Sequence, residues 1–197
     1  MSRPLIHFAA WLVGLATAET QTTIAERACL TRYAAGRLRL AEIGVWHGVT
    51  TSQLRAAMAA DGILFAVDPY PVGALGFSTQ RFIAHRTVSR LRNGTVKWLR
   101  MTGGAAARDG AVIAAPMDFV FIDGDHSYGG LQTDWESWSG LIASGGVVGL
   151  HDSRSTPERP ITGAGSVRYT QNIIRNDRRF RTVDEIDSLT VLTRVSL

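Results

Sequence analysis

RLAEIGVWHGVTTS, residues 39–52, is the stretch that decides how the rest of the chain is interpreted. An apolar run over residues 38–45 predicts a buried strand, and Gly44 and Gly48 interrupt it before a helical pattern begins. A strand, a glycine turn and a helix in this order suit a nucleotide-like ligand, because glycines allow close backbone approach and the helix start offers unpaired amides. Trp46 replaces the middle glycine of the dinucleotide fingerprint, so the turn taken alone also fits an ordinary connection.

The composition indicates one globular domain. The chain has 197 residues, 45% of them hydrophobic and 19% charged, which is enough to bury a sizeable core. Its single cysteine, Cys29, excludes an internal disulfide and is typical of a reducing compartment, so we expect a cytoplasmic protein. The formal net charge is +4, but the basic residues are scattered except at Arg178, Arg179 and Arg181. We expect no nucleic-acid partner, because no basic stretch is interleaved with aromatics.

The N-terminal residues 5–18 are mostly apolar and leave two interpretations open. Ala16-Thr17-Ala18 resembles a secretory cleavage site after a short positive start. The run is shorter than the roughly 20 residues of a membrane span, and His7 interrupts it. We favour an N-terminal helix that packs on the domain or on a second subunit. This interpretation predicts no membrane contact and raises homo-oligomer formation as a hypothesis.

Beyond the glycine turn, strand and helix patterns alternate regularly. Because parallel strands need crossover connections, the alternation predicts a largely parallel sheet with helices on both faces. A further helix is predicted between Thr23 and Gly36, with Glu26 completing a capping box. The last two strands are predicted to pair antiparallel. The predicted strands are residues 38–45, 63–67, 95–101, 119–122, 146–150, 180–186 and 189–195, and the other predicted helices are residues 51–60, 78–91, 103–114, 131–142 and 167–175.

Polar residues gather where the predicted strands end. Ligands of parallel α/β sheets bind beyond the carboxyl ends of the strands, at one edge of the sheet. Several acids converging at this edge are better explained by a binding site than by the needs of folding. The residues at these ends are Glu42, Gly44, Asp68, residues 102–104, Asp123, His151 and Asp152.

Four segments together resemble one known family. They are EIGVWHG at residues 42–48, FAVDPY at 65–70, FVFIDGDHSY at 119–128 and GGVVGLHD at 145–152. The set resembles class I S-adenosylmethionine (SAM)-dependent methyltransferases. It is most similar to the bacterial small-molecule O-methyltransferases grouped with the cephalosporin hydroxylase-like and the sugar or macrolide O-methyltransferases.

The resemblance implies a Rossmann-like three-layer α/β sandwich whose mostly parallel sheet has seven strands, the last one antiparallel. It also implies methyl transfer from SAM to a hydroxyl of a small molecule, such as a sugar, a polyketide or another natural product. We expect one methyltransferase domain over residues 1–197. Its parts are N-terminal helices at 1–37, a cofactor-binding core at 38–152, and a substrate loop, a helix and the terminal strand pair at 153–197.

Cofactor contacts follow from the resemblance by position. The methionine end of SAM is implied to lie at the glycine turn, its carboxylate at the start of the next helix, and its ribose hydroxyls on Asp68. After the third strand the chain departs from the family, because small residues there supply only backbone for adenine. The implied cofactor residues are Glu42, Gly44, Trp46, Gly48, Thr50, Thr51, Ser52, Asp68, Gly103, Gly104, Ala105 and Asp123.

The catalytic residues implied are His126, Asp123 and His151. Methyl transfer to oxygen needs a base, and Lys97 falls inside a predicted strand, which leaves His126 and His151. We favour His126, with Asp125 as the residue that could orient it. Asp123, His151 and Asp152 stand where metal-dependent relatives place Mg²⁺ ligands, although imidazole suits zinc, manganese or iron better. A divalent metal and a purely orienting role for these residues both stay open.

Two other functions remain to be separated from this one. Asp68 would also suit the ribose of an NAD-type oxidoreductase, but the triple-glycine fingerprint and the Tyr-to-Lys spacing of short-chain enzymes are missing. An RNA methyltransferase shares the fold, but the chain lacks a basic aromatic patch.

Overall fold

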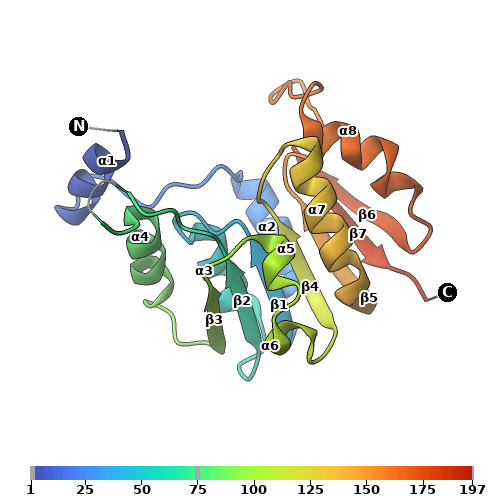
Figure 1. Ribbon diagram of the computed structural model, residues 1–197, viewed down its shortest axis with the longest axis horizontal. Coiled ribbons are helices and arrows are strands. Elements are labelled where there is room, and N and C mark those ends of the chain that lie inside the picture. Colours follow the sequence, from blue (N-terminus) through green and yellow to red (C-terminus); the bar gives the residue numbers. More distant parts are fainter. Residues whose placement is uncertain (1–2, 74–75, 197) are drawn as a thin grey trace.

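The computed structural model describes residues 3–73 and 76–196, which form one seven-stranded sheet between two layers of helices (Figure 1). The strand order is β3-β2-β1-β4-β5-β7-β6. The first five strands run parallel, and β7 is antiparallel to both β5 and β6. The predicted Rossmann-like sandwich is confirmed. The strands are β1 Arg39–Ile43, β2 Ile63–Val67, β3 Thr95–Leu99, β4 Met117–Ile122, β5 Ile142–Leu150, β6 Phe180–Ile186 and β7 Leu189–Arg194.

Alternating side chains of the central strands create the two cores. In β4, Phe119 and Phe121 pack with α2 and α3, whereas Val120 and Ile122 face the core that contains α7 and α8. Period-two alternation is what a strand covered on both faces requires. The helices are α1 Arg3–Leu12, α2 Ile24–Ala34, α3 Val49–Ala57, α4 Thr79–Val88, α5 Gly103–Ala106, α6 Gly110–Ile113, α7 Tyr128–Trp138 and α8 Gly165–Asn172, with 3-10 turns η1 Ser139–Leu141 and η2 Ile174–Asn176.

Most predicted elements are present, with local differences at their ends. The capping box is confirmed, since Thr23 Oγ1 accepts from the Glu26 amide and Glu26 Oε2 accepts from the Thr23 amide. The predicted helix over 103–114 is instead two short helices, because Asp109 caps a new turn by accepting from the Ala111 amide. The predicted helix over 131–142 ends at Trp138, and β5 already begins at Ile142.

The N-terminal apolar run forms a helix over only part of its length. Helix α1 ends at Leu12 and packs against α4, so it lies beside the sheet's β3 end in Figure 1. Within the described residues, none of the helices combines the length and the apolar character needed to cross a bilayer.

The two glycines of the turn after β1 serve different contacts. A side chain on Gly44, which has φ +89°, would place its Cβ 2.0 Å from the Asp123 carbonyl oxygen. Gly44 therefore lets the turn pass directly over the end of β4. A Cβ on Gly48, at φ +73°, would meet Ala84 and Val88 of α4 at 3.0–3.2 Å. The close approach at Gly48 is thus to α4, which corrects the prediction that it is to the cofactor.

We expect Gly44→Ala to lower the free energy of unfolding by more than about 3 kcal/mol, because left-handed strain adds to a clash with rigid backbone. The matched control is Gly36→Ala, at φ +68° with open space around it, where only the strain of about 1–2 kcal/mol applies. Urea denaturation measures both variants. Equal losses would show that the contact between the turn and β4 does not constrain the fold.

Candidate active site

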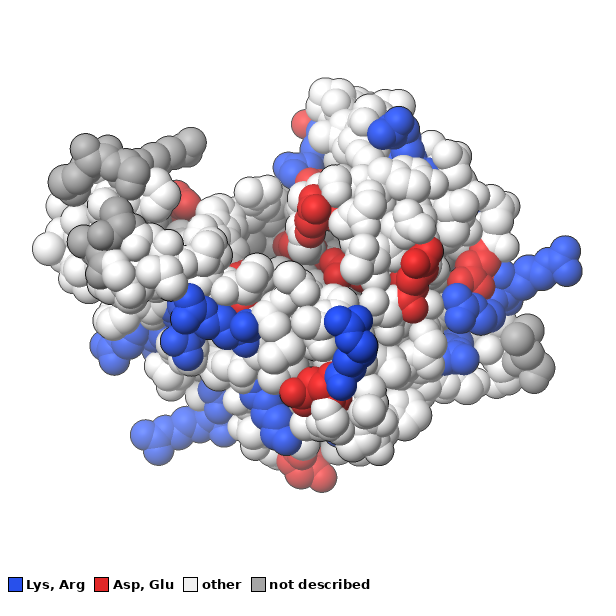
Figure 2. Space-filling view, in the orientation of Figure 1, with Lys and Arg blue, Asp and Glu red and all other residues white. Residues whose placement is uncertain are grey.

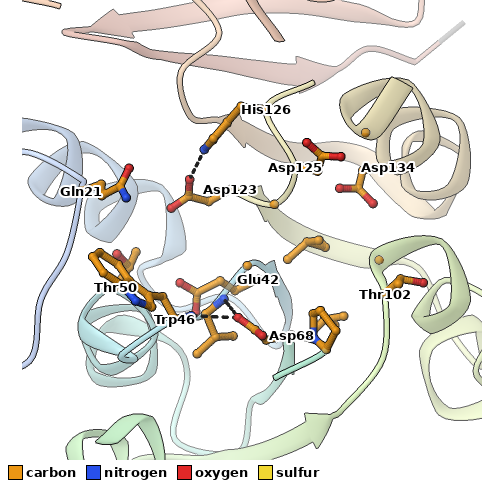
Figure 3. Close-up of a pocket in the computed structure, with 18 of the residues that line it drawn as sticks. Gln21, Glu42, Trp46, Thr50, Asp68, Thr102, Asp123, Asp125, His126 and Asp134 are labelled. Atoms are coloured by element: carbon orange, nitrogen blue, oxygen red, sulfur yellow. Dashed lines mark hydrogen bonds and ion pairs between the residues drawn. The ribbon is translucent and has the colours of Figure 1, made fainter. Parts of the chain in front are cut away.

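A cleft of about 670 Å³ opens at the carboxyl edge of the sheet, where β1, β2 and β4 end. One wall is formed by residues 19–21, which connect α1 to α2 and which we call the strap. Figure 3 shows the polar side chains facing the cleft from both walls and from its floor. Gln21, Trp46 and Thr50 lie on one side, Thr102, Asp125 and Asp134 on the other, and Glu42, Asp68, Asp123 and His126 between them.

Most of the predicted site residues line this cleft, but some do not reach it. Thr51 is fully buried inside α3, and Ser52 Oγ donates to the Gly48 carbonyl, so neither is placed to bind a cofactor carboxylate. The Ala105 amide is used within α5, where it donates to Thr102. The predicted residues that line the cleft are Glu42, Gly44, Trp46, Thr50, Asp68, Gly103, Gly104, Asp123 and His126, and those outside its lining are Gly48, Thr51, Ser52, Ala105, His151 and Asp152.

Asp68 holds the glycine turn in shape. Its Oδ2 accepts from the amides of Val45 at 3.1 Å and Trp46 at 3.0 Å, and its Oδ1 accepts from the Tyr70 amide at 2.8 Å (Figure 3). Successive amides turned to one side form an anion-binding concavity, and here the anion is an internal carboxylate. Trp46 has φ +49°, which is a costly conformation for a bulky residue and is held by this contact. Asp68 therefore shapes the turn as well as facing the cleft.

Glu42 is a buried acid at the floor of the cleft. It is 1% exposed, and its Oε2 has no hydrogen-bond partner among the described residues. Burial raises the pKa of Glu42 well above its usual value, and the nearby Asp123 and Asp68 carboxylates raise it further. Burial and the neighbouring carboxylates therefore favour the protonated form of Glu42, and a cationic group nearby would favour the ionised form.

His126 and Asp123 form the pair that faces the cleft. His126 Nε2 lies 3.5 Å from Asp123 Oδ1 and 3.9 Å from Asp152 Oδ2, and its side chain is 36% exposed. Asp125 does not orient this ring. Its two oxygens accept from the Ser127 amide and hydroxyl at 2.9 and 3.0 Å, so it shapes the loop before α7.

His151 lies behind Asp123 and is fully buried between two acids. Its Nδ1 is 2.8 Å from Asp123 Oδ1, and its Nε2 is 3.5 Å from Glu26 Oε2. Burial alone would lower the pKa of His151, but the two carboxylates raise it to about 10. The ring is therefore an imidazolium at neutral pH. It has no lone pair to offer as a base and does not line the cleft, so the predicted role of His151 as a base is wrong.

Glu26 anchors this buried pair to the rest of the fold. Its Oε1 accepts from the Ser188 amide at 2.9 Å and the Ser188 hydroxyl at 2.8 Å, and its Oε2 accepts from the Thr23 amide at 2.7 Å. Burial would raise the pKa of Glu26, but His151 and these donors lower it to about 2. The capping box was recognised in the sequence, whereas the contacts to His151 and Ser188, 125 and 162 positions away, carry no local signal.

The predicted Mg²⁺ ligands are already compensated by cationic side chains. Asp123, His126 and His151 bring ligand atoms within 4.8 Å of one another, but His151 is itself a cation. Asp152 lies 2.5 Å from Arg159 Nη2. Mg²⁺ needs oxygen ligands that are free to bind it, and imidazolium repels it. The arrangement does not fit a resident Mg²⁺.

Asp134 is a cleft residue that sequence reasoning missed. It is 7% exposed on α7 and fills the space left by the absent side chain of Gly103, since a Cβ there would lie 2.2 Å from Asp134 Oδ1. Burial, with Asp125 nearby, raises the pKa of Asp134 to about 6. A signal was present, because Asp134 falls on the same helical face as Leu131, Trp135 and Trp138. Asp134 therefore supplies a polar side chain to the cleft beside Gly103 and Gly104, which have none of their own.

Comparison with known proteins agrees with this geometry. A family model described as a methyltransferase domain matches residues 41–153, more than half of the chain. The chain belongs to this methyltransferase family. The match begins at β1 and ends just after the His151-Asp152 pair, so it covers every strand end that forms the cleft. The chain therefore contains a methyltransferase domain, as the sequence predicted.

Solved structures with the same fold include methyltransferases with different acceptors. The O-methyltransferase TomG from Streptomyces achromogenes, in complex with SAM, has a TM-score of 0.66 at 15% identity, covering 100% of this chain and 91% of that one. A putative rRNA methylase from Clostridium thermocellum has a TM-score of 0.60 at 10% identity, covering 86% and 95%. The N-methyltransferase NodS from Bradyrhizobium japonicum has 0.58 at 14% identity, covering 86% and 93%.

We expect the stability of the methyltransferase to fall as pH rises from 6.5 through about 10. The folded pKa of His151 is raised above its ordinary value, so its contribution is complete below 6.5 and is lost as the ring deprotonates. Glu26→Gln should cost about 3 kcal/mol at pH 6.5, because one partner of a buried ion pair is removed. The variant should also lose less additional stability between pH 6.5 and pH 10 than the wild-type protein loses.

Chemical denaturation at pH 6.5 and pH 10 measures both effects. Glu136→Gln is the matched control, since that acid lies on the exposed side of α7 and, among the described residues, its side chain accepts a hydrogen bond only from Gln132. An unchanged pH dependence in Glu26→Gln would show that His151 does not carry a charge that depends on Glu26.

Proposed function

We propose that this methyltransferase transfers the methyl group of SAM to a hydroxyl of a neutral small molecule, such as a sugar or a polyketide-type natural product. The observation that carries the proposal is the charge of the cleft. Among its described lining residues there is no Lys or Arg, whereas six are acidic. In Figure 2 acidic side chains likewise lie beside the hollow, while Lys and Arg side chains lie below it and at the edges of the face. The six acids are Glu19, Glu42, Asp68, Asp123, Asp125 and Asp134.

An acidic cleft disfavours the two alternative functions. RNA binding depends on basic side chains that neutralise phosphates, and a groove lined by carboxylates does the opposite. NAD carries a diphosphate, which the same carboxylates would repel. SAM instead carries a sulfonium cation, which the acids attract. The net charge of +4 therefore resides outside the cleft and gives no support to an anionic acceptor.

His126 is the base that the proposal requires. When bound, SAM supplies an electrophilic methyl group on a positively charged sulfur. With the ring proton on Nε2, facing Asp123, the lone pair of His126 lies on Nδ1. With SAM and an acceptor bound, His126 Nδ1 would take the hydroxyl proton as the acceptor oxygen bonds to the methyl carbon and the carbon–sulfur bond breaks. Asp123 stabilises the resulting imidazolium, and Asp123 is itself held in place by His151.

We expect His126→Gln to lower kcat by about 10²- to 10⁴-fold, the range for loss of a general base. Affinity for S-adenosylhomocysteine should change little, because that product contains no acceptor hydroxyl. Calorimetry measures the affinity, and single-turnover kinetics measure the chemical step. His85→Gln is the matched control, since His85 stacks on Trp98 outside the cleft lining. A normal kcat in His126→Gln would remove the base assignment.

Mass spectrometry with isotopically labelled SAM tests the function itself. Neutral sugars, phenols and polyketide glycosides are expected to gain one methyl group, whereas RNA oligonucleotides are not. Adding Mg²⁺ should leave the rate unchanged, because cationic side chains already compensate Asp123 and Asp152. Methylation of RNA alone would overturn the proposed acceptor class. A rate that depends on Mg²⁺ would overturn the metal-free arrangement while leaving the acceptor class intact.

A further inference from the structure

Three metal-ligating side chains converge at the strap, where Glu19 borders both the active-site cleft and a second cavity. His7 comes from α1, Glu19 from the strap, and His47 from the glycine turn after β1. The three residues lie in three different segments, so only the folded chain brings them together. They enclose a second cavity of about 550 Å³, which the start of α4 also borders through Thr79 and Gln80.

The distances among the three groups are close to those of a coordination sphere. His7 Nδ1 lies 3.3 Å from Glu19 Oε1, and one ligand atom from each of the three residues lies within 4.8 Å of the others. Ligands about 2.0–2.1 Å from a tetrahedral ion are separated by roughly 3.3 Å. The His7–Glu19 pair already has this spacing, and a shift of His47 on the order of 1–2 Å would bring its ligand atom to the same spacing from both.

The two imidazoles are positioned and available as ligands. Their rings stack with centroids 5.1 Å apart and planes 8° apart, and His47 also stacks on Trp46 at 4.8 Å. The lone pair of His47 lies on Nδ1, which accepts from the Glu19 amide at 3.0 Å. An ion at Nδ1 would take the place of that amide.

One nitrogen of His7 lacks a hydrogen-bond partner among the described residues. The His7 side chain is only 16% exposed, and that nitrogen is its buried Nε2. Buried polar atoms normally find a partner. Two imidazoles and one carboxylate suit Zn²⁺ and related late transition ions, whereas Mg²⁺ prefers oxygen ligands alone.

We propose that His7, Glu19 and His47 form a binding site for one Zn²⁺-class ion, with a fourth position open to water or to a ligand in the second cavity. The site is separate from the Asp123 cluster, since the strap and the glycine turn lie between the two. The ion would fasten α1 and the strap to the turn that carries Trp46. Because the strap and Trp46 both line the active-site cleft, metal binding would hold one wall of that cleft in place.

Zinc titration of the full, untagged chain after treatment with chelator tests the site. We expect calorimetry to show one ion per chain, and Co²⁺ in its place to give the visible absorption of a low-coordinate site with nitrogen ligands. His7→Phe keeps the stacked ring but removes the ligand, and Glu19→Gln keeps the shape but removes the charge. Each should weaken Zn²⁺ binding by about 100-fold or more, since even residues that only support metal ligands are worth 10- to 100-fold.

Two controls separate this site from other sources of binding. His126→Gln removes a member of the Asp123 cluster, and His85→Gln removes an unrelated histidine, so both should keep full Zn²⁺ affinity. Thermal unfolding of each variant confirms that it is folded. Loss of binding in His126→Gln with retention in His7→Phe would assign the ion to the Asp123 cluster and overturn the proposal. Failure of the folded wild-type chain to bind Zn²⁺ would overturn it as well, without affecting the proposed methyl transfer.

Discussion

The buried imidazolium of His151, placed between Glu26 and Asp123, is the interaction on which the rest of the site depends. Glu26 belongs to α2, His151 follows β5, Asp123 follows β4, and Ser188 lies in the turn between β6 and β7. A buried charge is costly unless partners compensate it, so these four segments must keep their relative positions for the fold to be stable. The same contacts fix Asp123, which faces His126 in the cleft. Stability and the geometry of the proposed base are therefore coupled.

A second constraint acts at the glycine turn. Gly44 lets the backbone cross the end of β4, and Asp68 collects the two amides that the turn exposes. Trp46 is held in a left-handed conformation as a result, and its indole forms part of the cleft wall. The acid at the end of β2 thus acts on the protein's own backbone before any ligand is bound. This explains why a turn without the dinucleotide glycine pattern still has a defined shape.

The charge of the cleft is opposite in sign to the net charge of the whole chain. The chain is basic overall, yet its cleft is lined by carboxyl groups. Two of these, Glu42 and Asp134, have raised pKa values because they are buried. The other four acids that line the cleft are Glu19, Asp68, Asp123 and Asp125, and the proposed cationic cofactor and uncharged acceptor suit this acidic lining. Net charge alone would have suggested an anionic partner, so the position of the charges matters more than their sum.

How far the sequence could predict the site is seen in individual residues. Asp68 and Asp123 were predicted because strand ends of a parallel sheet meet at one edge, and His126 because methyl transfer to oxygen needs a base. Thr51 and Ser52 were misplaced, because a turn of helix α3 carries them away from the cleft and sequence proximity to the glycine turn does not show this. Asp134 was missed because its helix was interpreted through its tryptophans.

By itself the sequence determined the order of strands and helices, the parallel core, the glycine turn and the acids at the strand ends. These are local features, since periodicity, capping and turn chemistry act within a few residues. Only the tertiary structure decided the charge of His151, the second role of Glu26, the contact of Gly48 with α4, and the meeting of His7 with His47. Each of these depends on burial or on groups distant in the chain, and desolvation and ion pairing exist only once the segments have packed.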